Sequence, residues 1–313
     1  MSRVAAIDCG TNSIRLLIAD FDGSGSATDV HREMRIVRLG QGVDATGLLA
    51  AEAIERTRAA LVDYAARFTE NGVERIRMVA TSATRDAANR EEFFAMTREV
   101  LGTEAEVISG DEEARLSFAG AVAAASEEEG PFLVVDVGGG STELVLGTLS
   151  GGDVAVEAAR SVDIGCVRLT ERCLHSDPPS ATELAEAERV AAEVLESAFE
   201  VVPVGRARTW IGVAGTVTTL SAVAQELPAY DSERTHGSVL STEQIRATEA
   251  RLAALSTEQR RALGPVHEGR ADVITGGAVV VRVLAEQLAE RAGIGQLLVS
   301  EKDILDGIAT SIA

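Results

Sequence analysis

Lysine is almost absent from the sequence. Lys302 is the only one in 313 residues, so the other basic residues are arginines, and the 29 basic residues face 49 acidic ones. The net charge of −20 argues against general binding to nucleic acid or to an anionic membrane, because both need a basic face. Any anionic ligand must therefore be held locally, and the planar guanidinium of arginine suits oxyanions.

Cysteine and long apolar runs are also scarce. Three cysteines without a Cys-x-x-Cys pair argue against a disulfide framework or a zinc site, and the four histidines show no metal-binding spacing. No apolar run approaches the ~20 residues of a membrane span, and the N-terminus lacks a signal-peptide core. The absence of Gly-x-x-x-x-Gly-Lys-Ser/Thr excludes the usual P-loop. We therefore expect a cytoplasmic protein.

A glycine-rich turn follows the most hydrophobic short run, residues 132–135. It reads Asp136-Val-Gly-Gly-Gly-Ser-Thr-Glu143. Glycines lack a Cβ, so their backbone N–H groups can approach an anion closely, and Ser141 and Thr142 add hydroxyl donors. The pattern predicts a phosphate-binding turn with an acidic residue on each side. The alternative is a plain glycine-rich hairpin, because residues 144–146 read as a return strand.

A second turn of the same kind occurs near the N-terminus. Asp8 opens the sequence Asp-Cys-Gly-Thr-Asn-Ser, between apolar strands expected at 4–7 and 16–19, and it lies 128 positions before Asp136. Each half then reads as βββαβαβα, which predicts an α/β fold with helices packed on mixed sheets. We expect domains at 1–126 and 127–313, separated by the acidic segment 127–130, with the final helix after residue 300 able to pack back on the first domain.

Several further elements are expected from local patterns. The third strands of the two halves are predicted at 34–39 and 154–159. A helix over 82–100 should break near Asn89, and capping boxes that begin at Ser180, Ser241 and Ser256 predict helix starts. The length of the chain is enough for two cores of ordinary size.

The duplicated pattern resembles the superfamily of sugar kinases, heat-shock chaperones and actin, which has two ribonuclease-H-like domains with phosphates in the cleft between them. Within it, the chain resembles the short, two-domain form of the exopolyphosphatase and guanosine pentaphosphate phosphatase (Ppx/GppA) family. Any one of the matching motifs is weak evidence for the family, but eight motifs in the family's order are strong evidence. They lie at 7–17, 38–42, 80–86, 108–114, 136–144, 212–219, 270–277 and 299–307.

The resemblance implies roles for individual residues. Hydrolysis of a phosphoanhydride needs charge neutralisation, a metal and a base for the attacking water. Asp8, Asp136 and Glu143 would surround a hydrated Mg²⁺, with Mn²⁺ as an alternative; otherwise they are turn-forming acids. Arg15 follows the first turn but lies in a strand, which makes it a weaker candidate. The phosphate-binding residues would be Gly10, Thr11, Asn12, Ser13, Arg85, Gly138, Gly139, Gly140, Ser141 and Thr142.

The base must be chosen between two adjacent glutamates. Ser109 and Glu112 have the spacing of a capping box, which would turn Glu112 back to the backbone and leave Glu113 for catalysis. The family pattern also places its catalytic glutamate at the second position. A helix N-terminus favours the ionised form that a base needs. If Gly110 or Asp111 is the cap, only the resemblance supports Glu113.

The expected activity is removal of terminal phosphate from inorganic polyphosphate, with a preference for short chains. The alternatives are the same chemistry on guanosine pentaphosphate, or a non-catalytic regulator that binds guanosine polyphosphates, which Glu113 disfavours. The turn at 212–219 could take distal phosphates or a nucleoside, or only pack a helix on a strand. The expected partners are polyphosphate or guanosine polyphosphate, with no nucleic acid and no membrane; a homodimer is compatible with the sequence.

Overall fold

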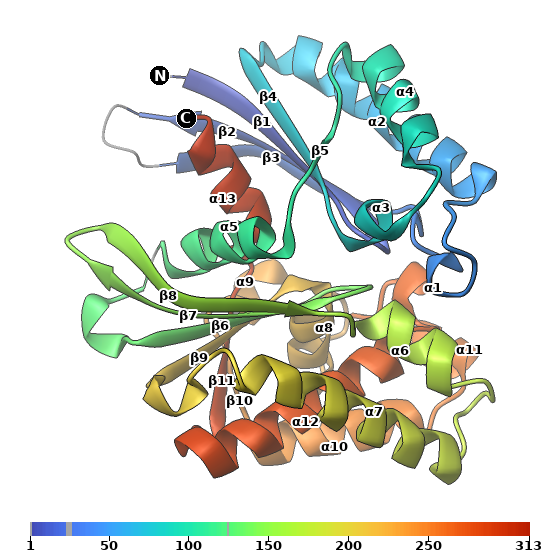
Figure 1. Cartoon of the computed structure of the whole chain (residues 1–313), viewed down its shortest axis with the longest axis vertical. Helices are drawn as coiled ribbons and strands as arrows, with labels where there is room; N and C mark the ends of the chain where they lie inside the picture. The colour runs from blue at the N-terminus through green and yellow to red at the C-terminus, as the bar shows by residue number, and fades with distance from the viewer. Residues whose placement is uncertain (1, 23–26, 124) are drawn as a thin grey trace. The chain divides into compact units, whose positions relative to one another are not determined.

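The computed structural model describes residues 2–22, 27–123 and 125–313 (Figure 1). The chain divides into two compact units. Unit 1 comprises Met1–Gly120 and Ile304–Ala313, and unit 2 comprises Ala121–Asp303. The acidic segment therefore lies inside unit 2, where Glu127–Glu129 form a short 3-10 helix, η1.

Unit 1 is built on a five-stranded mixed sheet in the order β3-β2-β1-β4-β5. β1 pairs antiparallel with β2 and parallel with β4, and β4 pairs parallel with β5. Its elements are β1 (Ser2–Cys9), β2 (Ser13–Phe21), β3 (Ala27–Ile36), α1 (Val43–Thr46), α2 (Ala51–Asn71), β4 (Arg75–Ala80), α3 (Ser82–Asp86), α4 (Arg90–Leu101), β5 (Glu106–Val107), α5 (Gly110–Val122), whose last residues enter unit 2, and α13 (Ile304–Ser311).

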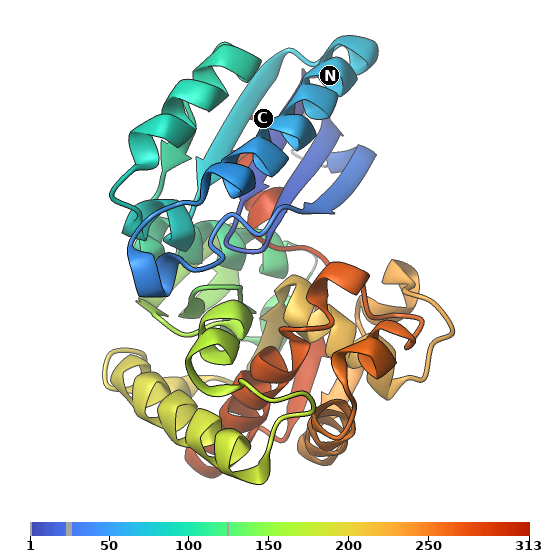
Figure 2. The same cartoon turned by 90° about the vertical axis from the view of Figure 1, so that its right-hand side faces the viewer.

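Successive strand residues point to opposite faces of the sheet, and residues on both faces of its central strands are buried. On one face, Ile7 lies in a core cluster with Leu61 of α2 and Phe93 of α4. Figure 2 shows α2 and α4 over this face. On the other face, Ala6 lies in a cluster with Ile308 of α13. The sheet is therefore the central layer of unit 1.

Helix α13 is attached to unit 1 by more than apolar contact. Arg32 Nη2 of β3 donates to Asp306 Oδ1 at 2.6 Å, and Arg77 Nη1 of β4 donates to Ser311 Oγ at 2.9 Å. A Cβ on Gly307 would lie 2.1 Å from the backbone oxygen of Leu116 in α5. Only glycine allows α13 and α5 to approach this closely.

Unit 2 contains a six-stranded mixed sheet in the order β10-β11-β9-β6-β7-β8. Apart from β10, the order from β8 to β11 repeats the order from β3 to β5 in unit 1. The duplicated α/β fold predicted from the sequence is confirmed. The elements are β6 (Phe132–Val137), β7 (Thr142–Ser150), β8 (Asp153–Val162), α6 (Cys166–Cys173), α7 (Ala181–Phe199), η2 (Val204–Arg206), β9 (Thr209–Val213), α8 (Ala214–Ala224), α9 (Ser232–Thr235), β10 (Val239–Ser241), α10 (Thr242–Ala253), α11 (Thr257–Arg261), η3 (Glu268–Arg270), α12 (Ile274–Ala292) and β11 (Gln296–Val299).

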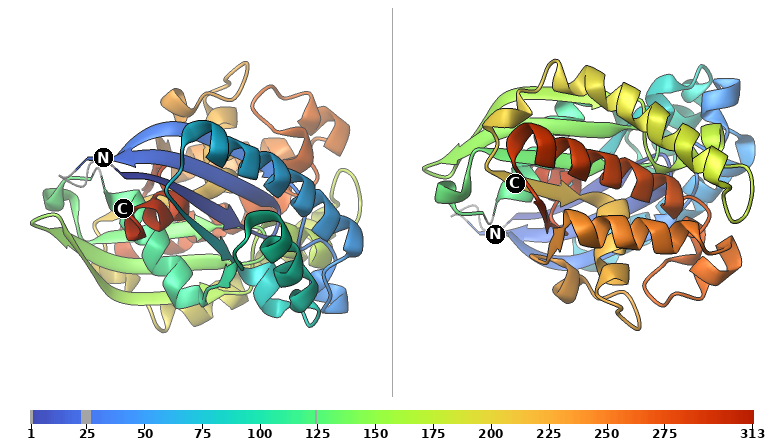
Figure 3. Two further views of the ribbon diagram at one scale, coloured as in Figure 1. Left: turned by 90° about the horizontal axis from the view of Figure 1, so that it is seen from above. Right: turned by 90° about the horizontal axis from the view of Figure 1, so that it is seen from below.

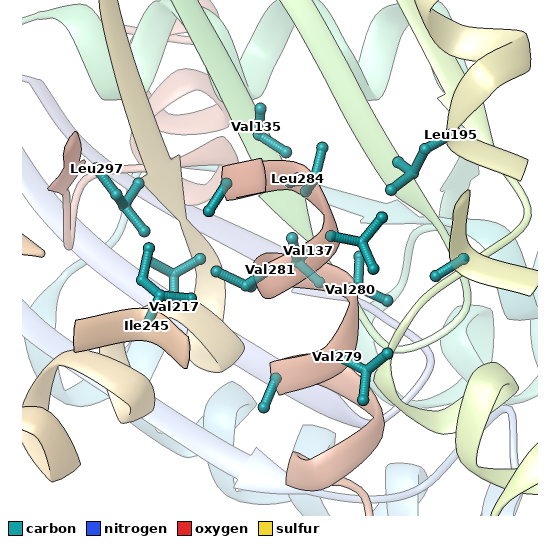
Figure 4. Close-up of a cluster of buried hydrophobic side chains, with 14 of the residues drawn as sticks. Val135, Val137, Leu195, Val217, Ile245, Val279, Val280, Val281, Leu284 and Leu297 are labelled. Atoms are coloured by element: carbon teal, nitrogen blue, oxygen red, sulfur yellow. The ribbon is translucent and has the colours of Figure 1, made fainter. Parts of the chain in front are cut away.

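The core of unit 2 is centred on α12. This helix lies beside α7 and α10 (Figure 3, right). Figure 4 shows Leu284 of α12 near Val135 of β6, in a cluster that also includes Val280 of α12 and Leu195 of α7. Within the described ranges of the chain, no helix is both long enough and apolar enough to cross a membrane.

An ion-pair cluster joins α12 to its neighbours. Arg282 of α12 lies 2.9 Å from Glu188 of α7, 3.0 Å from Glu286 of its own helix and 3.5 Å from Glu249 of α10. Three carboxylates therefore share this guanidinium. Burial raises the pKa of Glu249, and the negative charges of Glu188 and Glu286 raise it further, against the lowering effect of Arg282.

The prediction for the third strand of the first half is wrong. The strand is Ala27–Ile36, not 34–39. It is an edge strand in which no residue is buried, whereas the hydrophobic Val37 and Leu39 are buried in the segment after it. Apolar patterning therefore indicated the buried segment and missed the edge strand. The break near Asn89, between α3 and α4, is confirmed, as are the three capping boxes.

Candidate active site

The first turn joins β1 to β2 at the carboxyl end of β1. Gly10 N–H donates to Ser13 O at 2.9 Å and closes the turn. Asp8 faces Arg15 across the two strands, and Arg15 Nε and Nη2 donate to Asp8 Oδ2 at 3.0 and 2.6 Å. The weaker candidate from the sequence is therefore the direct partner of a predicted metal ligand. A guanidinium is fixed beside this turn.

The segment after β3 supports the same turn. The N–H groups of Val37 and Arg38 both donate to Asn12 O, at 3.0 and 2.9 Å, and Gly40 N–H donates to Thr11 O at 2.8 Å. A Cβ on Gly40 would lie only 2.4 Å from Thr11 Cγ2. Glycine is thus required for this close approach, a role that sequence reasoning missed although the Gly40-x-Gly42 pattern marks it.

Two other segments reach the same edge of the first sheet. β1, β4 and β5 are parallel, so the residues that follow them lie at one end of the sheet. Thr81 N–H donates to Cys9 O at 3.2 Å, and the Oγ1 atom of Thr11 lies 2.9 Å from Ser82 Oγ. Ile108 N–H donates to Ala80 O at 3.2 Å. The first turn, α3 and the start of α5 are therefore held together.

The two glutamates at the start of α5 have different surroundings. Ser109 Oγ accepts from Glu112 N–H at 3.2 Å, as the predicted cap requires. The predicted return of the Glu112 carboxylate to the backbone is wrong: it accepts from Arg77 Nη2 at 2.7 Å and its side chain is 46% exposed. The Glu113 side chain is only 9% exposed and accepts from Arg85 Nη1 at 3.1 Å. Two residues predicted for the site, Glu113 and Arg85, are thus in direct contact.

The second turn repeats the first in unit 2. Gly138 N–H donates to Ser141 O at 3.1 Å, and the segment after β8 supports the turn, since Cys166 N–H donates to Gly138 O at 2.9 Å. A Cβ on Gly165 would lie 2.5 Å from Gly139 O. The hydroxyl of Thr142, predicted to contact phosphate, donates to Ile164 O at 2.6 Å. That hydroxyl is therefore part of the internal bonding of the turn.

The acidic residues at the two ends of the second turn face each other. Asp136 on β6 and Glu143 on β7 are register partners, and both are buried. Ser161 Oγ donates to Glu143 Oε1 at 2.7 Å, which fixes the carboxylate. Mg²⁺ usually takes one or two carboxylates and completes its shell with water and phosphate oxygens. These two side chains fit that requirement.

The third predicted metal ligand, Asp8, belongs to the other unit. Over the described ranges, no group of three or more His, Cys, Asp or Glu side chains is arranged to hold a metal ion. Asp8 belongs to unit 1, where it carries the ion pair with Arg15. Within unit 2 the predicted metal ligands that lie together are thus Asp136 and Glu143, and a metal role for Asp8 stays a prediction.

The turn after β9 has an arginine packed on it. A Cβ on Gly215 would lie 2.1 Å from Arg270 Nη2, and Arg270 Nη1 donates to Thr219 Oγ1 at 2.9 Å. Cys166 lies nearby, and burial raises the pKa of its thiol. Burial and the Asp8 carboxylate likewise raise the pKa of the Cys9 thiol. Both thiols stay protonated near neutral pH and are poor nucleophiles.

A duplicated mixed-sheet fold with a tight, backbone-lined turn in each half, and a buried carboxylate paired with arginine, defines a class of phosphate-handling hydrolases. The model of the Ppx/GppA phosphatase family matches residues 17–312, and the chain belongs to this family.

Individual relatives are similar over their full length. Exopolyphosphatase 2 of Mycobacterium tuberculosis is 59% identical over 321 aligned positions, covering 100% of this chain and 99% of the relative. A crystal structure described as an exopolyphosphatase-like protein superimposes with a TM-score of 0.95 at 44% identity, covering 100% of this chain and 98% of that one. The Aquifex aeolicus member of the Ppx/GppA family gives a TM-score of 0.79 at 34% identity, with coverages of 99% and 97%.

Proposed function

We propose that the protein is an exopolyphosphatase, which hydrolyses the terminal phosphoanhydride bond of inorganic polyphosphate and releases orthophosphate. The observation that carries the proposal is the buried Glu113 carboxylate held by Arg85 at the edge of the first sheet. A fixed carboxylate can take a proton from water, and a guanidinium beside it can bind phosphate. The similarity to the M. tuberculosis exopolyphosphatase supports the substrate class.

In this proposal each turn supplies charge stabilisation from its own side chains and backbone. The N–H groups of Thr11, Asn12, Gly139 and Gly140 donate to phosphate oxygens, as backbone donors do in anion-binding turns. Asp136 and Glu143 would hold Mg²⁺, which supplies charge neutralisation on the phosphate oxygens when bound.

Asp8 has a second role in the proposal. Its place as a third carboxylate at the metal stays a prediction, and Arg15 donates two hydrogen bonds to it. A carboxylate bound in this way orients a guanidinium. Asp8 therefore holds Arg15 beside the first turn, where the guanidinium adds positive charge for phosphate.

The test is phosphate release measured by malachite green, run in parallel on polyphosphates of defined length and on guanosine pentaphosphate. The proposal expects kcat/KM on short polyphosphate to exceed that on guanosine pentaphosphate by at least about tenfold, which corresponds to about 1.4 kcal/mol. The reverse order assigns the protein to guanosine pentaphosphate. Tight binding of guanosine polyphosphate with no turnover of either substrate would instead indicate the regulator.

Short chains and distributive cleavage form the finer part of the proposal. The net charge of −20 disfavours an extended basic track of the kind that would hold a long polyanion. Activity on long chains should therefore rise as salt increases from ~0.05 to ~0.2 M, because salt screens the repulsion outside the site. A partial digest on a gel should show the whole population shifting gradually downward. Full-length chains beside free phosphate, with no intermediates, would contradict this expectation.

A further inference from the structure

Among the residues that the structure describes, the Arg85 guanidinium donates hydrogen bonds from one of its edges only. Its Nη1 donates to Glu113 Oε2 at 3.1 Å and to Ile108 O at 3.0 Å. Its Nε and Nη2 donate to no group in the described ranges 2–22, 27–123 and 125–313. The side chain is 25% exposed, so solvent reaches it. One end of the guanidinium is thus fixed to the predicted base while the donors on its other edge remain available.

The backbone fixes the relative positions of this pair. Arg85 N–H donates to Thr81 O at 3.0 Å in the short helix that follows β4, and Glu113 N–H donates to Ser109 O at 2.9 Å at the start of α5. The carbonyl of Ile108, which also accepts from Arg85, is in the segment after β5. Because β4 and β5 are parallel neighbours, the arginine and the glutamate come from adjacent positions on one sheet edge.

We propose that Arg85 is a positioning residue that holds the base and the terminal phosphate at a fixed separation. Nη1 stays on Glu113, while Nε and Nη2 donate to two oxygens of the phosphate. A planar guanidinium can do both at once, because its donors lie on separate edges. The inference rests on the proposed function and deepens it.

This geometry defines the place of the attacking water. Glu113 takes one proton from the water, and the water oxygen forms a bond to the phosphorus held on the other edge of Arg85. The bridging P–O bond breaks, and its electron pair stays on the shortened chain. Fixing the base and phosphorus on one rigid group removes much of the positional freedom that slows the reaction, and a displacement of about 1 Å can lower the rate about 100-fold.

Lysine provides the discriminating substitution. An ammonium keeps the charge but is a single point donor and cannot bridge two acceptors with fixed geometry. We expect Arg85→Lys to change KM for short polyphosphate by less than about threefold and to lower kcat by at least about tenfold. Arg85→Ala should raise KM and lower kcat together. A purely phosphate-binding arginine would instead show its effect in KM.

The pH profile gives a second readout. A nearby cation favours the ionised form of a carboxylate. In Arg85→Ala the acid limb of kcat/KM should therefore move to higher pH, whereas in Arg85→Lys it should move less. Both substitutions leave the other charged side chains of unit 1 unchanged, so a shift of the acid limb reports on Arg85. They include Asp111, Glu112 and Arg115 on α5, Arg77 on β4, Asp86 on α3, Asp8 and Arg15 on β1 and β2, Arg32 on β3 and Asp306 on α13.

Arg77→Lys is the matched control. Arg77 pairs with Glu112, one residue before Glu113 on the same helix, at 2.7 Å. This substitution perturbs an arginine–glutamate pair between β4 and α5 that the proposal does not use. Its kcat, KM and acid limb should match those of the wild type.

The deciding experiment is a double-mutant cycle with Glu113→Gln, measured in single turnover with labelled polyphosphate. If Arg85 acts through Glu113, Arg85→Lys should lower the rate at least about tenfold in the wild type but less than about threefold in the Glu113→Gln background. Equal losses in both backgrounds, or unchanged kcat in Arg85→Lys, would overturn the inference. Thermal melts check that each variant is folded, and the lysine variant keeps the test decisive if the alanine variant unfolds. A wild type that releases no phosphate from polyphosphate instead refutes the proposed function.

Discussion

Replacing Glu113 by glutamine tests the assignment of the base. Glutamine keeps the shape of the side chain and can still accept from Arg85 through its carbonyl oxygen, but it cannot take a proton from water. Loss of a general base lowers kcat by about 10²- to 10⁴-fold, or about 2.7–5.4 kcal/mol of transition-state stabilisation. Exchanging a charged hydrogen bond for a neutral one costs about 1–2 kcal/mol of folding stability. Most molecules of the variant therefore stay folded at 25 °C, and the drop in kcat reflects loss of the catalytic base and not unfolding.

The matched control is Glu112→Gln. Glu112 is adjacent on the same helix and also pairs with an arginine, but its side chain is about half exposed. Phosphate release from a short polyphosphate should be nearly unchanged in this variant, and substrate binding should stay within a few-fold in both. An inactive Glu112→Gln together with an active Glu113→Gln would refute the assignment.

Three other outcomes follow from the structure. Asp136→Asn and Glu143→Gln should each raise the Mg²⁺ concentration for half-maximal phosphate release, and full activity in excess EDTA would contradict the metal assignment. Gly165→Ala should lower thermal stability by about 1–3 kcal/mol, because its Cβ would lie 2.5 Å from a backbone oxygen of the second turn, whereas Gly295→Ala meets nothing within 4 Å. Glu249→Gln should raise the melting temperature most at pH 7–8. The raised pKa of Glu249 means that the folded protein binds its proton more tightly, so the wild-type carboxyl stabilises the fold at acid pH and loses that stabilisation as pH rises through the folded pKa. A gain in melting temperature of Glu249→Gln over the wild type that grows toward pH 4 would refute this reasoning.

The sequence alone predicted the duplicated fold and both turns, because each depends on local signals. An apolar strand that ends in Asp-x-Gly is visible within ten residues, and so is a capping box. The separation of Glu113 from Glu112 also came from a local signal, the serine three positions before Glu112. The actual partner of the Glu112 carboxylate is Arg77, which is 35 positions away and contacts Glu112 only in the folded chain.

Other features of the site could not be predicted, because they arise from pairing between distant segments. The contact between Arg15 and Asp8 requires the register of β1 and β2, and the pattern of charges does not show which carboxylate an arginine selects. The close approach of Gly40 to Thr11 depends on the path after an edge strand whose polar residues gave no apolar signal. The bridging position of Arg85 requires the parallel arrangement of β4 and β5.

The membership of α13 in unit 1 has a consequence for synthesis on the ribosome. Ile304 and Ile308 complete the core on one face of the first sheet, yet they are translated after the whole of unit 2. At about 5–20 residues per second, strands β1, β2 and β4 wait roughly 10–60 s before the residues of α13 are translated. The N-terminal half therefore cannot finish folding first, in contrast to the usual order of multidomain proteins. Its exposed apolar face is a natural target for chaperones during this interval, and a nascent chain stalled before residue 304 should be more sensitive to protease in unit 1 than the released protein.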